Sequence, residues 1–372
     1  MNENKKKIFN IENINFSQKT PLIIAELGTS HNADIAKARE MTAAAAEAGA
    51  NCVKFQMVFA DEILHPNTGE ITLPGGRIRL YDRFKELETP VEFYMEIKNY
   101  VESLGLLFLC TPFGHKSASI LKQIQPKVVK IASPELNFTS LLEEIAEWKL
   151  PVLLSSGVSR LSDIEKALDI FSDKQQICLL HCVTAYPAPE TDYNLRVLHN
   201  LSAIFDVSVG VSDHSADPEL VPALAVSMGA AVVEKHFCLS RTDSGLDDPI
   251  ALPPKDFAQM VRSVKQAAED TLEKTISDYK NKYTNNFVEQ ILGNGVKELA
   301  PSEKENYRFT NRSVHALRDI SAGEIIKKND YAVLRTEKNL RPGLEPYWEK
   351  AVEGRTAHNF IPAGEGIRFE DI

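Results

Sequence analysis

Residues 209–237 read V-G-V-S-D-H-S, then an apolar stretch, then A-V-V-E-K-H-F, and this segment decides the fold. Each end is a β-branched run bounded by turn residues, which predicts a buried parallel strand. The stretch between them, 218–228, predicts the crossover helix of a βαβ unit. Because the strands are then parallel, His214 and His236 lie at the same carboxyl edge, where α/β folds bind ligands. Neighbouring neutral imidazoles suit a divalent metal such as Mn, Fe, Co or Zn. Two unrelated histidines, one packed and one exposed, are the alternative.

The same alternation of predicted strands and helices continues through most of the chain. Strands are expected at residues 22–27, 52–57, 107–111, 128–133, 152–156, 177–183, 207–212 and 231–237. Helical patterns lie between them, including 35–48, 91–104, 116–124, 140–148 and 161–171, and a last helix is expected at 254–274. Eight βα repeats are what a TIM (β/α)8 barrel requires, so we predict that α/β fold. A doubly wound sheet is the rival architecture, although it rarely has eight evenly spaced repeats.

The chain of 372 residues is long enough for two domains. We expect an N-terminal lead-in at 1–20, the barrel at 21–274, a polar linker at 275–308 and a small β-rich domain at 309–372. The small domain contains two A-G-E turns, each ahead of an isoleucine, which suggests a pseudo-repeat of strand, turn and strand. Since so small a unit buries little core of its own, we expect it to lean on the barrel or on a second chain.

The composition argues against several classes of protein. Hydrophobic residues make up 43% and charged residues 25%, and the net charge of -10 argues against a general binder of nucleic acid or of anionic membranes. No apolar stretch is long enough to span a membrane, and no signal-peptide pattern follows the basic run near the start. The five cysteines have no metal-site spacing, which is typical of buried free thiols in a reducing compartment. We therefore expect a cytoplasmic protein.

One connection between a strand and the next helix is unusually long. Residues 58–90 contain P-N-T-G and P-G-G and far exceed the ~2–6 residues of an ordinary βα loop. A long loop on the carboxyl face of a barrel often carries function. A solvated surface excursion is the alternative.

Reactive side chains collect where the predicted strands end, as expected for a barrel enzyme. In chain order they are Glu26, Lys54, Gln56, Thr111, Lys130, Ser133, Glu135, Ser155, Thr184, Tyr186, Ser212, His214, Glu234, His236 and Asp247. Two lysines with several hydroxyls form an anion cradle, for which phosphate is the obvious candidate. A metal beside a phosphate and a carboxylate suggests addition to, or cleavage at, a phosphorylated small molecule. For each lysine taken singly, the alternative interpretation is a strand-end residue without a functional role, whose amine reaches solvent.

Eight segments, taken in order, carry a resemblance to a known family. They are I-A-E-L-G-T-S-H-N (24–32), V-K-F-Q (53–56), L-C-T-P-F (109–113), V-K-I-A-S-P-E (129–135), L-S-S-G-V (154–158), L-H-C-V-T-A-Y-P (180–187), V-G-V-S-D-H-S (209–215) and V-E-K-H-F (233–237). This ordered set resembles the N-acetylneuraminate (sialic acid) synthase family. The C-terminal segments N-R-S-V-H-A, N-L-R-P-G-L and I-P-A-G-E-G-I are similar to the antifreeze-protein-like (SAF) domain that closes those enzymes.

The resemblance implies condensation of phosphoenolpyruvate with N-acetylmannosamine or a related amino sugar. The products would be a nine-carbon 2-keto acid and phosphate, with cleavage of the C–O bond of phosphoenolpyruvate. By the same resemblance Glu26 would be the acid/base, and His214 and His236 would hold a divalent metal, with Mn²⁺ expected and Mg²⁺ or Co²⁺ as alternatives. The residues expected to bind phosphoenolpyruvate are Lys54, Thr111, Lys130, Ser133, Ser155 and Ser212, and those expected to contact the sugar are Gln56, Glu135, Thr184, Tyr186 and Asp247.

One further residue of the resemblance lies in the small domain. Arg341, in L-R-P-G, matches an arginine that the family supplies to the site of a neighbouring subunit. The resemblance therefore implies a domain-swapped homodimer.

The sequence departs from the family pattern at two positions near the expected sugar site. Ala33 replaces the glycine of the family's N-H-N-G, and Thr184 stands where family members that use N-acetylmannosamine carry asparagine. A legionaminate or pseudaminate synthase, which takes a diamino sugar, is therefore an alternative. A 3-deoxy-octulosonate-phosphate-type enzyme would need a second phosphate site, for which the sequence offers no spare basic cluster. A non-catalytic sugar-binding homologue would not need Glu26, both lysines and both histidines together.

Overall fold

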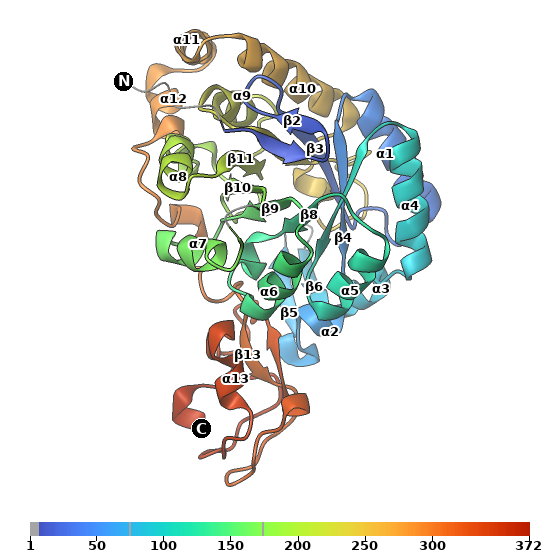
Figure 1. The fold of residues 1–372 in the computed structure, drawn as a ribbon, viewed down its shortest axis with the longest axis vertical. Helices are drawn as coiled ribbons and strands as arrows, with labels where there is room; N and C mark the ends of the chain where they lie inside the picture. The colour runs from blue at the N-terminus through green and yellow to red at the C-terminus, as the bar shows by residue number, and fades with distance from the viewer. Residues whose placement is uncertain (1–6, 74–75, 173–174) are drawn as a thin grey trace.

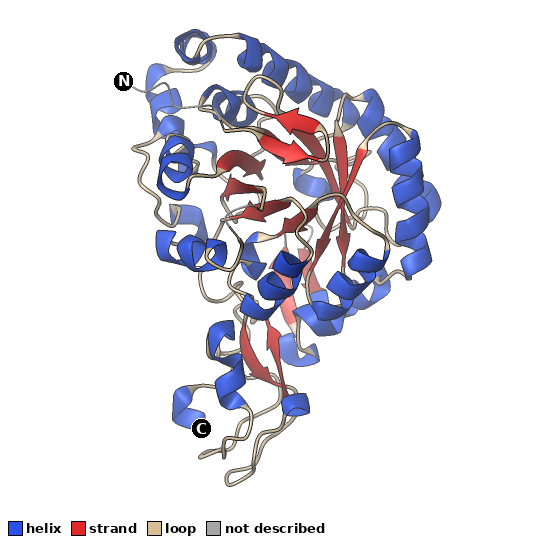
Figure 2. Ribbon diagram, in the orientation of Figure 1, coloured by secondary structure: helices blue, strands red, loops and turns tan. Residues whose placement is uncertain are grey.

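The computed structural model describes residues 7–73, 76–172 and 175–372. Its centre is an eight-stranded parallel sheet in the order β7-β4-β3-β12-β11-β10-β9-β8, and the two end strands lie side by side, so the sheet closes into a barrel (Figures 1 and 2). The strands are β3 (Leu22–Gly28), β4 (Cys52–Met57), β7 (Leu107–Pro112), β8 (Val129–Ile131), β9 (Val152–Ser155), β10 (Ile177–Cys182), β11 (Ser208–Asp213) and β12 (Val232–His236). All eight predicted strands are present, and the predicted TIM barrel is confirmed.

Helices surround the sheet on its outer side (Figure 2). They are α1 (Ile35–Glu47), α4 (Val91–Ser103), α5 (His115–Gln123), α6 (Thr139–Glu147), α7 (Leu161–Leu168), α8 (Val197–Phe205), α9 (Leu220–Ser227) and α10 (Pro254–Glu269). Helix α9 is apolar on all sides and fully buried, because α10 and α11 (Leu272–Lys282) cover it. None of the helices in the described ranges has the length and apolar character of a membrane span.

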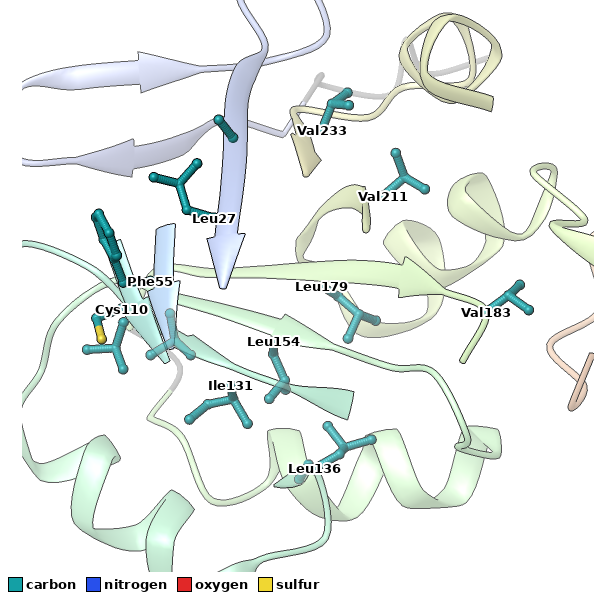
Figure 3. Packing of buried hydrophobic residues seen from close by; sticks show 14 of the residues in the cluster. Leu27, Phe55, Cys110, Ile131, Leu136, Leu154, Leu179, Val183, Val211 and Val233 are labelled. Atoms are coloured by element: carbon teal, nitrogen blue, oxygen red, sulfur yellow. The ribbon is translucent and has the colours of Figure 1, made fainter. Parts of the chain in front are cut away.

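Side-chain alternation along each strand separates the core outside the barrel from the barrel interior. In β4, Val53 and Phe55 point outward, and Lys54 points inward. Figure 3 shows part of the hydrophobic cluster between sheet and helices, with Leu136 and Val183 just beyond strand ends; its labelled members are Leu27, Phe55, Cys110, Ile131, Leu136, Leu154, Leu179, Val183, Val211 and Val233. The inward positions toward the carboxyl ends of the strands can therefore be occupied by polar side chains.

The predicted lead-in forms a hairpin, β1 (Phe9–Ile11) paired with β2 (Ile14–Phe16), and its residues 1–6 lie outside the described part. Phe9, Ile11 and Phe16 pack against the inward-facing residues at the amino-terminal ends of the strands, including Leu22 and Cys52. The hairpin thus closes the bottom of the barrel with apolar side chains. Only the carboxyl ends of the strands remain for a polar site.

The long loop after β4 has structure of its own. It contains α2 (Ala60–Ile63), η1 (Pro66–Thr68), the hairpin β5 (Glu70–Leu73) with β6 (Gly76–Arg79), and α3 (Leu80–Leu87), while Pro74 and Gly75 lie outside the described residues. The small domain rests on this loop: Asn339 Nδ2 donates to the carbonyls of Thr68 (2.6 Å) and Glu70 (2.8 Å). The loop is therefore a docking platform and not a solvated excursion.

The segment predicted as a polar linker, 275–308, differs from that expectation in its first half. It holds the end of α11 and all of α12 (Asn285–Leu292), whose Val288, Ile291 and Leu292 are buried against the barrel. The charged face of α11 points to solvent, which explains why its composition resembles that of a linker.

The small domain follows as β13 (Ser313–Ala316) paired antiparallel with β14 (Tyr331–Leu334) and the short helix α13 (Glu349–Val352). Its two A-G-E turns each place glycine at positive φ, +83° at Gly323 and +92° at Gly364. Two backbone bonds of 2.9 Å between Ile320 and Ile361 join the two halves of the expected pseudo-repeat. The domain lies beside α2, β5 and α6 at the carboxyl side of the barrel (Figure 1).

Candidate active site

The inward face of the barrel changes from apolar to polar near the carboxyl ends of the strands. Leucine, isoleucine, valine and cysteine occupy the lower layer that packs on the N-terminal hairpin. One step further along the same faces stand Glu26, Lys54, Thr111, Lys130, Ser155, Ser212 and Glu234, all at most 4% exposed. The period of two that builds the core therefore also builds a ring of polar side chains at the carboxyl edge.

Four charged groups form the centre of this ring. Lys54 Nζ lies 3.1 Å from Glu26 Oε2 and 3.3 Å from Glu234 Oε1, and Lys130 Nζ lies 3.4 Å from the same Glu234 oxygen. Ser212 Oγ also donates to Glu234 Oε1 at 2.9 Å. Glu234 thus lies between the two lysines and holds their ammonium groups on neighbouring positions.

The pKa shifts of these groups distinguish the two lysines. Burial alone would lower the pKa of Lys54, but Glu234 and Glu26 outweigh it and raise that pKa. For Lys130 burial is the larger effect, so its pKa falls despite Glu234. Burial would raise the pKa of Glu234, but the charges of Lys130 and Lys54 lower it. Nearby carboxylates neutralise the charge of Lys130 less than that of Lys54, so an incoming anion would be stabilised most beside Lys130.

Buried hydroxyls around the charges lack partners. Within the described residues, Thr111 Oγ1, Ser155 Oγ and Thr184 Oγ1 make no hydrogen bond, although each is buried. A buried polar atom without a partner costs about 1–3 kcal/mol. Their clustering beside two lysines fits a site whose ligand supplies the missing acceptors.

The two histidines come together as predicted from their strands. Their ring centroids are 5.4 Å apart, and the ring of Tyr186 stacks on His214 at 4.3 Å. His214 Nδ1 lies 2.9 Å from the carbonyl oxygen of Val183, so Nε2 carries the lone pair when Nδ1 carries the proton, and the nearest partner of Nε2 is the Tyr186 hydroxyl at 3.4 Å. Burial lowers the pKa of His214 and takes that of His236 to about 3, so both rings are neutral, the form that binds metal.

The donor set fits a divalent metal held by few protein ligands. In the described ranges no three His, Cys, Asp or Glu side chains converge as a complete ligand set. Two imidazoles leave several coordination positions for water and substrate, as catalytic sites require and as Mn²⁺ and Mg²⁺ tolerate. The fixed Nδ1 contact of His214 is the kind of outer contact that orients a ligating imidazole.

A second group of predicted residues converges beside the histidines. Gln56 Nε2 donates to Glu26 Oε1 at 2.7 Å, and Asp247 Oδ2 lies 3.8 Å from His236 Nδ1. A Cβ added to Gly28 would lie 3.4–3.5 Å from Gln56, Asp247 and Glu26, so these three side chains face one point. That point is lined by oxygen and nitrogen atoms suited to hydroxyl groups of a sugar.

Glu135, predicted as a sugar contact, is fully buried and is engaged by the small domain. Arg312 and Arg335 form ion pairs with Glu135 Oε1 at 2.9 and 2.5 Å. Glu135 Oε2 is buried without a partner. Only this second oxygen is left for a ligand.

The structure does not bring Arg341 to this cluster within one chain. Its guanidinium pairs with Asp371 at 2.6 Å and donates to the carbonyl of Gly366, both in the small domain. Its role toward a neighbouring subunit stays a prediction. The small-domain arginines that reach barrel residues within the chain are Arg312 and Arg335.

Glu234, which the sequence places at the end of its strand without a role, stands two positions before His236 and shares its face. The sequence does not single out two other residues. Arg312 and Arg335 have their partners 177 and 200 residues away in the chain, and no local pattern marks them.

Comparison with known proteins agrees with this architecture. A profile of the NeuB family matches residues 41–275, and one of the SAF domain matches residues 311–372. The chain is 33% identical to the spore coat polysaccharide biosynthesis protein SpsE of Bacillus subtilis, over 98% of this chain and 97% of that protein. It is 31% identical to a pseudaminic acid synthase of Campylobacter jejuni, over 97% and 99% of the two chains, and 30% identical to an N,N'-diacetyllegionaminic acid synthase of the same species, over 87% and 92%.

Solved structures give the same result. The crystal structure of B. subtilis SpsE superimposes with a TM-score of 0.80 at 32% identity, covering 98% of this chain and 99% of SpsE. The N-acetylneuraminic acid synthetase of Leptospira borgpetersenii, in complex with citrate, gives 0.65 at 32% identity, covering 75% and 98%. The chain belongs to the NeuB family of sialic-acid-synthase-like proteins and carries a C-terminal SAF domain.

Proposed function

We propose that the protein condenses phosphoenolpyruvate with the open-chain aldehyde of an N-acetylated amino sugar, giving a nine-carbon 2-keto acid and phosphate. C3 of phosphoenolpyruvate forms a bond to the aldehyde carbon, and the aldehyde oxygen takes up a proton. Water adds at C2, the bond from C2 to the bridging oxygen breaks, and phosphate leaves. The names of the relatives, which are synthases of pseudaminic, legionaminic and sialic acids, support this proposal.

The observation that carries the proposal is the buried ring of two lysines with unpartnered hydroxyls. Each ammonium has three N–H bonds. Lys54 is near two carboxylate oxygens and Lys130 near one, so both retain donors for phosphate and carboxylate oxygens. Thr111 and Ser155 add short neutral donors from the neighbouring strands. The lysines thus stabilise the negative charge that develops on oxygen during the reaction.

The remaining residues bind and orient the aldehyde. Glu26, between Lys54 and Gln56, is placed to hold or move a proton at the reacting oxygen. Gln56, Asp247 and Tyr186 would orient the sugar hydroxyls. His214 and His236 would hold a divalent ion, Mn²⁺ by expectation, whose contribution when bound is to polarise the aldehyde. Holding both substrates in one geometry is the other large contribution.

The sugar is N-acetylmannosamine or a diamino sugar of the legionaminic or pseudaminic type. Thr184 lacks the side-chain amide with which asparagine would contact N-acetylmannosamine. The diamino sugars are therefore equal candidates.

We further propose a cytoplasmic, domain-swapped homodimer. All five cysteines are buried and unpaired, which fits a reducing compartment. The small domain exposes Tyr347, Trp348 and Phe369, and a second chain would cover such an aromatic group.

The test is a panel of amino-sugar aldoses assayed for phosphate release from phosphoenolpyruvate with Mn²⁺. We expect release with one or more 2-acetamido or 2,4-diacetamido sugars and none without sugar. Tight binding of a sugar without any phosphate release would overturn the proposal in favour of a sugar-binding homologue.

A further inference from the structure

The segment that connects the barrel to the small domain crosses the ends of β9 and β10. It contains η5 (Pro301–Glu303), and the Glu303 side chain is 1% exposed. Glu303 Oε2 accepts hydrogen bonds from the backbone N–H of Val158 and of Thr184, each at 2.9 Å. Its other oxygen accepts from Ala300 N at 3.1 Å. One carboxylate therefore joins the loops that follow two different strands.

The same segment and the first residues of the small domain hold the carbonyl groups of these two residues. Asn306 Nδ2 donates to the Thr184 carbonyl at 2.7 Å, and Asn311 Nδ2 donates to the Val158 carbonyl at 3.2 Å. Val158 and Thr184 are thus held on both sides by residues that follow the barrel. Bonds to an ionised carboxylate are stronger than bonds between neutral groups, so Glu303 dominates this contact.

The backbone at Val158 has an unfavourable conformation. Its φ is +43°, in the left-handed region that β-branched residues rarely adopt. Such a conformation persists where the surroundings over-determine it. The bonds to Glu303 and Asn311 fix the peptide groups on either side of this residue.

The two loops meet at Gly157, beside the ligand site. A Cβ at Gly157 would lie 2.3 Å from Thr184 Oγ1 and 2.9 Å from Ser133 Oγ, and Gly157 N donates to Ser133 Oγ at 3.0 Å. Thr184 Oγ1 thus lies close against Gly157, and the Thr184 backbone that carries it is fixed by Glu303 and Asn306. Thr184 Oγ1 is itself buried and unpartnered within the described residues. A shift of the Thr184 backbone would therefore move a polar atom of the sugar pocket.

We propose that Glu303 is a positioning residue for the sugar pocket, one that fixes Thr184 and the Gly157 loop and so sets which sugar is accepted. This inference rests on the proposed function. It gives the segment between the domains a part in substrate selection, although none of its residues need touch the substrate.

The test compares Glu303→Ala, Glu303→Gln and the matched control Glu305→Ala, an exposed acid two residues along the same segment. Removing a charged acceptor of two buried N–H groups should raise the KM for the sugar about tenfold. The KM for phosphoenolpyruvate should change much less, because the lysines are untouched. Glu303→Gln keeps an oxygen that can accept from Val158 and Thr184 but loses the charge and the acceptor for Ala300 N, so it should recover part of the loss, and the control should behave as wild type.

A second readout does not depend on activity. Amide hydrogen exchange should rise at Val158 and Thr184 in Glu303→Ala and stay unchanged in the core strands. A folded Glu303→Ala protein with wild-type sugar KM and wild-type exchange at these amides would overturn the inference. An equal loss for both substrates with a general rise in exchange would also overturn it, in favour of a purely structural role. Absence of phosphate release in wild type with every sugar would instead defeat the proposed function, while the exchange result would still test the contact.

Discussion

Lys235 Nζ lies 2.5 Å from Asp213 Oδ2, and these two residues are register partners on β12 and β11. Each stands one position before a histidine of the candidate metal site, His236 and His214, and points to the opposite face of its strand. Lys235 also donates to the carbonyl of Ser215 at 2.6 Å, and both charged side chains are at most 1% exposed. The pair therefore locks the register of the two strands that carry the histidines.

Removing one partner of this pair should destabilise the fold strongly. In Lys235→Met the carboxylate of Asp213 stays buried without its counter-charge, which costs about 3–5 kcal/mol. Urea unfolding of the variant checks this value. The double variant Asp213→Leu/Lys235→Met removes both charges and should be clearly more stable than the single variant; equal losses in the two would contradict the ion-pair account.

Acid should destabilise the protein through its buried neutral histidines. Burial lowers the pKa of His31 and of His315 to about 4 and that of His181 to about 3. The unfolded chain takes up a proton on each near pH 6.5, so it binds more protons than the folded chain between pH 6.5 and about 4. Stability is therefore full above pH 6.5 and falls as the pH drops through this window, by roughly 2 kcal/mol per histidine at pH 5.

Urea unfolding at pH 7 and pH 5 measures this loss. His31, packed 4.8 Å from the ring of Phe93, is the simplest one to remove. A His31→Gln variant should be less stable at pH 7 and should lose less stability between pH 7 and pH 5 than wild type. An unchanged pH dependence would show that His31 does not titrate as described.

Much of the fold could be predicted from the sequence because its signals are local. Continuous apolar runs bounded by turn residues mark the strands, and the alternation of faces along a strand places Lys54 and Glu26 on the inner side. The contacts of Glu135 could not be predicted in this way. Its strand-end position is readable, but its arginine partners come from the small domain, and only the folded chain shows that one of its oxygens is already taken.

The metal ligands can be tested by loss of ion binding. His236→Ala should abolish metal-dependent turnover and weaken Mn²⁺ binding, measured by calorimetry, while the melting temperature without metal stays near that of wild type. Within the described residues the His236 ring makes no hydrogen bond, and Asp247 Oδ2 approaches its Nδ1 only to 3.8 Å, so the substitution breaks no hydrogen bond of the fold. Wild-type activity that survives chelation would refute the metal role.

The domain-swapped arrangement predicts complementation between inactive variants. Arg341→Ala should weaken sugar use about 10–100-fold through loss of charged hydrogen bonds, with phosphoenolpyruvate binding retained. Mixed with Glu26→Gln, it should regain activity, because a heterodimer then holds one intact site. A mixture of Glu26→Gln with Glu26→Ala is the control and should stay inactive. Failure of the first mixture to recover would mean that the small domain serves its own chain, as the contact of Arg335 with Glu135 permits.

The most direct test of the central claim uses phosphoenolpyruvate labelled with ¹⁸O at the bridging oxygen, in the presence of Mn²⁺ and the accepted amino sugar. The proposed cleavage between C2 and the bridging oxygen predicts that mass spectrometry finds the label in the released phosphate. Label retained in the keto-acid product, with none in phosphate, would mean P–O cleavage and would contradict the account.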